Sequence, residues 1–167
     1  ALPISAANQK RSVGKGTLVW GTDISKYVDN LYPNYDFTAR VLSEKGVKPD
    51  FASDAEIRYA HRKHQDYDLY FVANRSTDPA QVVATFRING KVPELWDPMT
   101  GETRILTDFK SSDGETLVPL KFESEQSYFI VFRKDGTSNS SKKNFADHTS
   151  IQTLDKPWSV FFDPKWG

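Results

Sequence analysis

A regular alternation of apolar and polar residues through the middle of the chain, about residues 57–134, most constrains how it can fold. The stretches "DLYFVAN" and "VVATFRI" both alternate with period two, which is the pattern of strands with one face toward a core. Further strands are expected at "YAHRKHQ", "ETRIL", "TLVPLKF" and "SYFIVFR". Short alternating strands separated by turns predict an antiparallel β-sandwich.

Turn residues divide these strands. Asn89-Gly90 follows "VVATFRI" and is a strong hairpin signal, because both residues tolerate positive φ. We therefore expect "VPELW" to be the return strand, with Pro93 indicating a sheet edge. Asp113-Gly114 predicts another turn.

The first 52 residues do not show this alternating pattern. "GTLVW", residues 16–20, is a short apolar run that predicts a buried strand. A helix is expected over 22–31, ending before Pro33, and a second over 37–46 with Gly46 as its C-terminal cap. A strand followed by helices is typical of an α/β unit, so we predict a small α/β remnant at residues 1–52 and the sandwich at 53–135.

Residues 136–167 form the third predicted segment. "KDGTSNSSKKN" is polar and predicts a flexible linker. "WSVFFDPKWG" after it is strongly aromatic and predicts the first strand of a following domain. Because exposed apolar side chains are unfavourable, we expect this segment to dock on the sandwich or on the N-terminal part, or to pair with a neighbouring chain. The chain also opens without methionine, so we expect it to be a piece of a longer protein.

Composition excludes several classes of function. The 22 basic and 22 acidic residues cancel without a long run of one sign, so a nucleic-acid partner is not expected. The chain has no cysteine, which rules out disulfides, thiolate catalysis and cysteine-ligated metals. No apolar stretch is long enough to span a membrane, so no membrane partner is expected, and residues 1–10 are not an intact signal peptide.

"WDPMTG", residues 96–101, carries the candidate carbohydrate-binding residues Trp96 and Asp97. In the functional interpretation the Trp96 indole stacks on a sugar ring and the Asp97 carboxylate accepts a hydrogen bond from a sugar hydroxyl. In the structural interpretation Asp97 caps a turn that Pro98 and Gly101 complete, and Trp96 packs into the sandwich. We favour the structural interpretation because each residue then has a role in the turn.

His61 and His64 are three residues apart in "YAHRKHQ". On a strand an odd offset places two side chains on opposite faces, so we expect no metal bound by both and no cofactor. Catalytic residues are not expected either. Glycosidic hydrolysis needs two carboxyl groups across a cleft, one with a raised pKa, and the acidic residues of this chain lie mostly in turns. A Gly-x-Ser-x-Gly nucleophile elbow and a phosphate-binding glycine loop are also absent from the sequence.

Several phrases in order, among them "GKGTLVWG", "IRYAHRK", "DLYFVANRS", "TFRINGKVPELWDPMTGE" and "WSVFFDPKWG", resemble the C-terminal half of glycoside hydrolase family 106. These are large, α-L-rhamnosidase-like enzymes common in polysaccharide-degrading Bacteroidetes. The resemblance covers about residues 14–167. It implies a catalytic barrel outside this chain, and here the tail of an α/β domain, a β-sandwich and the first strand of a galactose-binding-like domain. No catalytic residue is carried over.

We therefore expect a non-catalytic accessory sandwich of a multidomain glycoside hydrolase acting on plant or host polysaccharide. Its partners would be other domains of the same chain, with carbohydrate as a further candidate, and its location periplasmic or secreted. The alternative is an independent carbohydrate-binding module, which would need two or three coplanar exposed aromatic rings.

Overall fold

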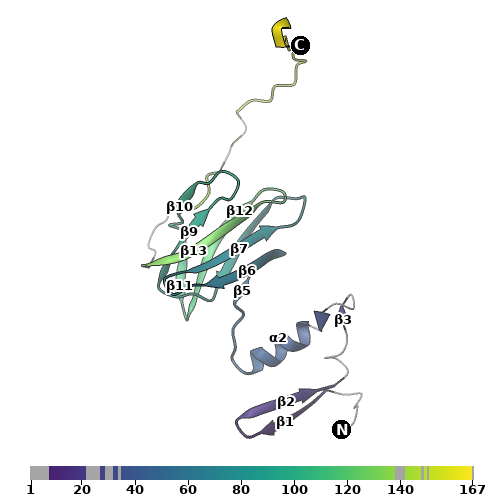
Figure 1. Ribbon diagram of the computed structural model, residues 1–167, viewed down its shortest axis with the longest axis vertical. Helices are drawn as coiled ribbons and strands as arrows, with labels where there is room; N and C mark the ends of the chain where they lie inside the picture. Colours follow the sequence, from purple (N-terminus) through teal and green to yellow (C-terminus); the bar gives the residue numbers. More distant parts are fainter. Residues whose placement is uncertain are drawn as a thin grey trace.

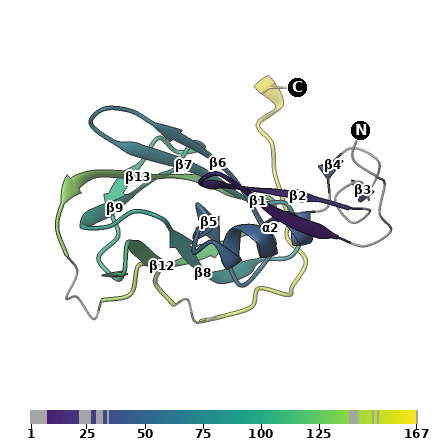
Figure 2. The ribbon, with the colours of Figure 1, turned by 90° about the horizontal axis from the view of Figure 1, so that it is seen from below.

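Two antiparallel sheets form the centre of the molecule (Figures 1 and 2). The structure is a computed structural model, and it describes residues 8–21, 27–28, 32–33, 35–137, 142–147, 149 and 151–166. One sheet has the strand order β10-β9-β13-β7-β6 and the other β11-β12-β8-β5. The predicted antiparallel β-sandwich is therefore confirmed. The strands are β5 (Phe51–Ala52), β6 (Ile57–Lys63), β7 (Asp68–Asn74), β8 (Ala80–Phe86), β9 (Lys91–Trp96), β10 (Thr103–Ile105), β11 (Lys110–Ser112), β12 (Glu115–Phe122) and β13 (Ser127–Asp135).

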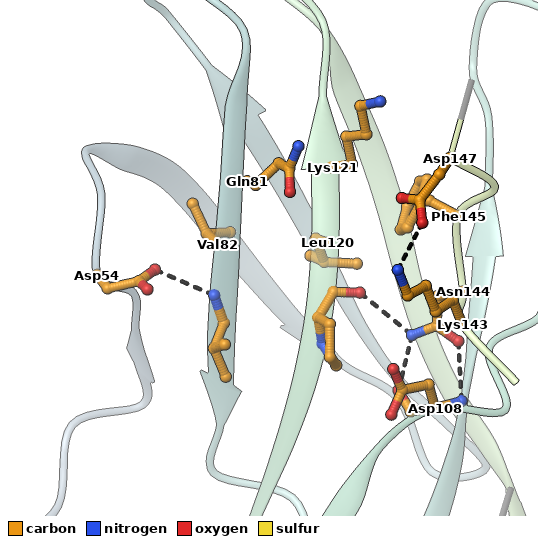
Figure 3. A pocket seen from close by; sticks show the side chains of 12 residues that line it. Asp54, Gln81, Val82, Asp108, Leu120, Lys121, Lys143, Asn144, Phe145 and Asp147 are labelled. Carbon is orange, nitrogen blue, oxygen red and sulfur yellow. Dashed lines mark hydrogen bonds and ion pairs between the residues drawn. The ribbon is translucent and has the colours of Figure 1, made fainter. Parts of the chain in front are cut away.

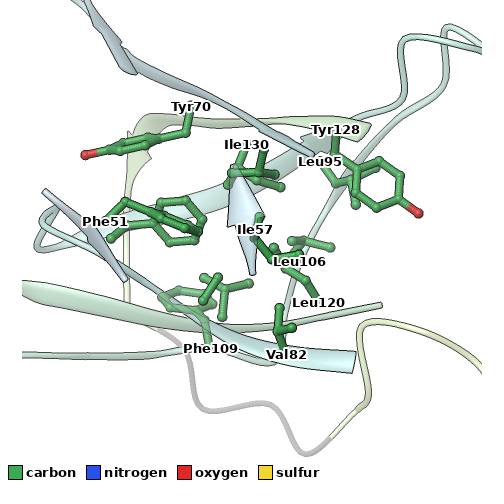
Figure 4. Close-up of a cluster of buried hydrophobic side chains, with 14 of the residues drawn as sticks. Phe51, Ile57, Tyr70, Val82, Leu95, Leu106, Phe109, Leu120, Tyr128 and Ile130 are labelled. Carbon is green, nitrogen blue, oxygen red and sulfur yellow. The ribbon is translucent and has the colours of Figure 1, made fainter. Parts of the chain in front are cut away.

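The alternation in the sequence sets which side chains enter the core. Every second residue of β7, β8 and β12 is buried, and the residues between them face outward. Figure 4 shows the resulting cluster between the two sheets. At its centre the Tyr70 and Phe86 rings meet edge to face with centroids 4.9 Å apart, and Phe132 packs 5.2 Å from Phe86. Burying each large apolar side chain contributes about 1.5–3 kcal/mol, so this cluster holds the two sheets together.

The hairpin expected at Asn89-Gly90 is wrong. The chain bends there, with Gly90 at φ 69°. However, β8 belongs to the four-stranded sheet and β9 to the five-stranded sheet, so the chain crosses from one sheet to the other. The period-two pattern is the same whichever sheet a strand joins, and it therefore could not separate a hairpin from a crossover. The turn expected at Asp113-Gly114 is confirmed, because it joins the paired strands β11 and β12.

Pro93 does not mark an edge strand, because β9 lies between β10 and β13. Its carbonyl accepts a hydrogen bond from the Leu106 N–H at 2.9 Å, just past the last pair between β9 and β10. A proline has no N–H to return the second bond of this pair. The proline therefore lies where the β10 ladder stops, rather than at the edge of the sheet.

The N-terminal segment differs from expectation in two respects. Residues 16–20 do form a strand, but β1 (Gln9–Val13) and β2 (Gly16–Trp20) are an antiparallel hairpin whose residues are exposed or half-buried. The expected buried strand is therefore wrong, since a two-stranded hairpin has no second layer to cover it. The helix expected over 22–31 is wrong at its described residues, which form β3 (Tyr27–Val28) paired with β4 (Tyr32–Pro33). The other residues of 22–31 lie outside the described part of the chain.

The second expected helix is confirmed as α2 (Tyr35–Glu44). The helix ends at Glu44, and Gly46, at φ 70°, caps it as predicted. The Gly46 N–H bonds to the Ser43 carbonyl and the Val47 N–H to the Leu42 carbonyl, the two bonds of a Schellman cap. None of the helices described here is long and apolar enough to cross a membrane.

Polar contacts tie these N-terminal elements to one another and to the sandwich. Lys45 donates to the Thr17 hydroxyl at 2.9 Å, which joins α2 to the β1–β2 hairpin. Lys48, just after the helix, forms an ion pair with Glu115 at 2.9 Å. Arg87, after β8, donates to the Lys48 carbonyl at 3.2 Å.

The C-terminal segment does not dock on the described part of the chain, so the expected docking on the sandwich or on the N-terminal part is wrong, and pairing with a neighbouring chain stays a prediction. Every described residue from 151 to 166 is exposed, including Trp158 at 73% and Phe162 at 76%. The segment extends away from the sandwich and is not a strand; its one regular element is a short 3-10 helix, η1 (Pro164–Trp166) (Figure 1). An apolar sequence favours burial, but it does not supply the surface that would bury it.

Candidate functional site

A pocket of about 310 Å³ lies on the outer face of the four-stranded sheet (Figure 3). Outward residues of β8 and β12 form its floor, and residues 143–147 form one wall. Register places Gln81 of β8 opposite Lys121 of β12, so their polar side chains are neighbours in the pocket. The lining residues are Asp54, Gln81, Val82, Val83, Asp108, Pro119, Leu120, Lys121, Lys143, Asn144, Phe145 and Asp147.

The wall of this pocket is held in place by Asn144, which is buried. Its side-chain oxygen accepts a bond from the Asp108 N–H at 2.9 Å. Its amide nitrogen donates to the carbonyls of Asp108 at 2.7 Å and Pro119 at 3.1 Å. The end of the predicted flexible linker is therefore fixed to the sandwich. The sequence did not indicate this attachment, because Asn144 is one polar residue within a polar stretch.

The pocket suits hydrogen bonding better than proton transfer. Asp54 accepts a bond from the Val83 N–H at 3.0 Å, which gives its carboxylate a structural role. Phe145 supplies an aromatic wall, but the Arg104 guanidinium lies over its ring at 4.7 Å. Amide, ammonium and carboxylate groups on one small surface can bind sugar hydroxyls.

Trp96 and Asp97 lie at the end of β9, outside this pocket. The Asp97 carboxylate accepts bonds from the N–H groups of Met99 at 2.8 Å and Thr100 at 3.3 Å. Gly101, at φ 75°, donates its N–H to the Asp97 carbonyl. The turn predicted for "WDPMTG" is therefore present. The expected packing of Trp96 into the sandwich is wrong, because Trp96 is half-buried on the outer face of the five-stranded sheet, where its indole N–H donates to Glu94 at 3.3 Å.

The two histidines bind different carboxylates. His61, in β6, places Nδ1 3.0 Å from Asp50 and Nε2 2.9 Å from Asp68. Its ring stacks on Tyr70 with a centroid separation of 4.0 Å, and burial raises the pKa of that tyrosine. His64 is exposed and pairs with Asp66. Because Asp50 precedes β5 and Asp68 begins β7, His61 connects the two sheets and has a structural position.

An ion cluster around the buried Glu94 was missed by sequence reasoning. Glu94 is 4% exposed, although it faces outward from β9. Arg133 donates to it with contacts of 2.8–3.1 Å, and Lys134 lies 3.3 Å away. A register shift between Phe132 and Lys134 lets both consecutive cations reach one carboxylate. The signal in the sequence was Glu94 in an apolar strand, together with adjacent basic residues in another.

The electrostatics of the cluster oppose acid catalysis. The hydrogen bonds from Arg133 lower the pKa of Glu94, and Lys10 lowers that of Glu44. A glycosidic proton donor needs a raised pKa, so neither group is suited to that role. The Arg133 guanidinium also lies 5.5 Å from the centre of the Trp96 ring. The cluster therefore holds Trp96 in position.

Comparison with known proteins identifies the family to which the chain belongs. The model of glycoside hydrolase family 106, described as alpha-L-rhamnosidase, matches residues 5–110, more than half of the chain. The chain belongs to this family. The resemblance inferred from the sequence phrases is thus confirmed.

Two similar proteins are much longer than this chain. A putative beta-glucuronidase of Formosa agariphila is 29% identical over 145 residues, which cover 84% of this chain and 11% of that protein. The solved structure of a rhamnosidase from Novosphingobium sp. PP1Y is 27% identical with a TM-score of 0.60, covering 84% of this chain and 12% of that one. The chain spans about a tenth of the length of these relatives.

Proposed function

We propose that this chain is a non-catalytic accessory segment of a multidomain glycoside hydrolase and mainly supports the catalytic domain. The observation that carries the proposal is the coverage: nearly the whole chain aligns with only 11–12% of two much longer relatives. Under the proposal, the parent protein is periplasmic or secreted and acts on plant or host polysaccharide.

Exposed apolar surface on both sides of the sandwich supports this role. On the α2 segment Tyr35, Leu42 and Val47 are exposed, and a groove follows the same helix. The C-terminal segment exposes Trp158, Val160, Phe161, Phe162 and Trp166. Large apolar patches on a soluble protein mark surfaces that contact something else. The flanking segments therefore fit contacts with other domains of one longer chain.

Activity measurement tests the proposal directly. We expect the isolated chain not to hydrolyse aryl α-L-rhamnosides, whereas the complete polypeptide that carries it is expected to hydrolyse a glycoside. The assay follows release of the aryl group at enzyme concentrations high enough to detect weak turnover. Turnover by the isolated chain that disappears when one of its acidic residues is replaced would refute the accessory role.

An independent carbohydrate-binding module is the second candidate, with Trp96 and Asp97 as its proposed contacts. The polar pocket beside Phe145 favours some sugar affinity. The aromatic geometry argues against a carbohydrate-binding module, because the planes of the Phe71 and Phe129 rings are tilted by 54° relative to each other and Arg133 lies over the Trp96 ring. Calorimetric titration with rhamnose- and glucuronate-containing oligosaccharides separates the candidates: saturable binding that is lost in Trp96→Ala would favour the module.

A further inference from the structure

The outer side of the five-stranded sheet carries a group of neighbouring apolar side chains. We call it the aromatic face and define it as Leu69, Phe71, Trp96, Phe129 and Val131. Strand register aligns Trp96, Phe129 and Phe71 in one row across β9, β13 and β7. Val131 is 1% exposed although it lies outside the core cluster, so the row around it is closely packed. The other four residues are half-buried, each with part of its surface open.

Cations border the aromatic face on two sides. Register places Arg58 opposite Ala73 and Arg62 opposite Leu69, so both arginines emerge on this side of β6. Arg133 and Lys134 border the opposite end, where their side chains are 47% and 57% exposed. An apolar centre with a basic rim complements a surface that has an apolar centre and acidic groups around it.

The Glu94 cluster prepares one part of this surface for binding. The indole N–H of Trp96 is bonded to Glu94, and Arg133 binds Glu94 while lying over the indole. Tryptophan and arginine are the residue types most enriched at the energetic centres of protein interfaces. Side chains already fixed before binding lose less entropy when a partner arrives. The cluster thus favours a protein partner, while the tilted phenylalanine rings disfavour a sugar.

We propose that the aromatic face is the surface on which another domain of the same polypeptide packs, through an apolar patch with an acidic rim. This inference rests on the proposed accessory function and identifies the partner surface within it. The longer relatives supply the reason to choose this occupant, because about nine-tenths of their length lies outside the aligned region. A domain joined covalently has a high effective concentration, so a partly buried face of this kind suffices for stable contact.

Hydroxyl-radical footprinting with mass spectrometry tests the inference. The isolated chain and the complete polypeptide that carries it are oxidised in parallel, and the rates at Trp96, Phe71 and Phe129 are compared. We expect all three to be oxidised several-fold more slowly in the complete polypeptide. Tyr67, in the turn between β6 and β7 and 37% exposed, serves as the internal control with equal rates in both.

A charge reversal on the rim provides a variant that leaves the core intact. Arg62→Glu changes an exposed side chain and is expected to increase oxidation of Trp96 and Phe129 in the complete polypeptide. Lys110→Glu, an exposed change on the other sheet, should leave these rates unchanged. Rates unaffected by Arg62→Glu would contradict the role assigned to the basic rim.

Three results would overturn the inference. Equal oxidation of the face in both samples would show that no domain covers it. Protection in the isolated chain, together with a dimer in sedimentation, would assign the face to a second copy. Protection produced by added oligosaccharide would assign it to sugar. None of these results tests the accessory function, which the activity assay tests separately. An isolated chain that is inactive and whose aromatic face is not protected in the complete polypeptide would therefore refute this inference but not the accessory function.

Discussion

His61 connects the two sheets through its contacts with Asp50 and Asp68. We expect His61→Ala to lower the free energy of unfolding by about 1–3 kcal/mol, because buried Asp68 loses its bond to the imidazole. Urea denaturation measures the change. His64→Ala is the matched control: that histidine is exposed, and its loss should change stability by less than about 0.5 kcal/mol. Equal effects of both variants would show that the His61 bonds add nothing.

Glu94 should make stability depend on pH at acid values. Its folded pKa is lowered, mainly by the Arg133 hydrogen bonds, so the ionised group stabilises the fold above the ordinary carboxyl pKa of about 4.3. That contribution disappears as the pH falls through the lower folded value. We therefore expect Glu94→Gln to have a lower Tm than the wild type at pH 7, with the difference shrinking below about pH 4. Glu102→Gln, in the exposed turn, should show no such convergence.

At the scale of elements, Asn144 attaches the segment 142–147 to the sandwich. Asn144→Ala removes all three of its side-chain bonds to the Asp108 and Pro119 backbone. The segment should then detach more often, exposing the peptide bonds after Lys142 and Lys143. We expect faster tryptic cleavage at these two lysines, followed by mass spectrometry. Asn89→Ala, which removes an exposed amide elsewhere, should leave the rate unchanged. An unchanged rate in Asn144→Ala would place the attachment in other contacts.

Elements whose signal is local could be predicted from the sequence. Strands β7, β8 and β12 follow from period two, and the end of α2 follows from Gly46, because a Schellman cap is formed by adjacent residues. Contacts between distant residues could not be predicted. The crossover after Asn89-Gly90 depends on which sheet β9 joins, and the exposure of β2 depends on what covers it.

The same distinction applies to the candidate site. The turn at "WDPMTG" was predictable because Asp97 bonds to residues two and three positions away. The Glu94 cluster required knowing that β9 and β13 are neighbours and that their register shifts at Arg133. The pocket required knowing that Asn144 returns to Asp108, 36 positions earlier. A single sequence shows Glu94 in an apolar strand and the basic pair Arg133-Lys134, but it does not show that they meet, nor that Asn144 meets Asp108.

At the scale of the whole molecule, the sandwich has its own core, whereas the C-terminal segment has none. We expect a chain ending at Asp147 to keep the Tm of the full chain, because all described residues from 151 to 166 are exposed. Self-association should decrease, since Trp158, Phe161 and Trp166 are removed from the solvent-facing surface. Differential scanning calorimetry and light scattering measure the two effects.

A core substitution gives a reference value for the loss of stability that the truncated chain is compared with. Phe132→Ala empties a fully buried site between the aromatic rings of the core and should cost about 3–5 kcal/mol. If removal of residues 148–167 lowers the Tm by a comparable amount, the segment is part of the folding unit. If the Tm is kept and association falls, the exposed aromatic side chains are dispensable for the fold. Their apolar surface is then available for the contacts with a longer polypeptide that the accessory function requires.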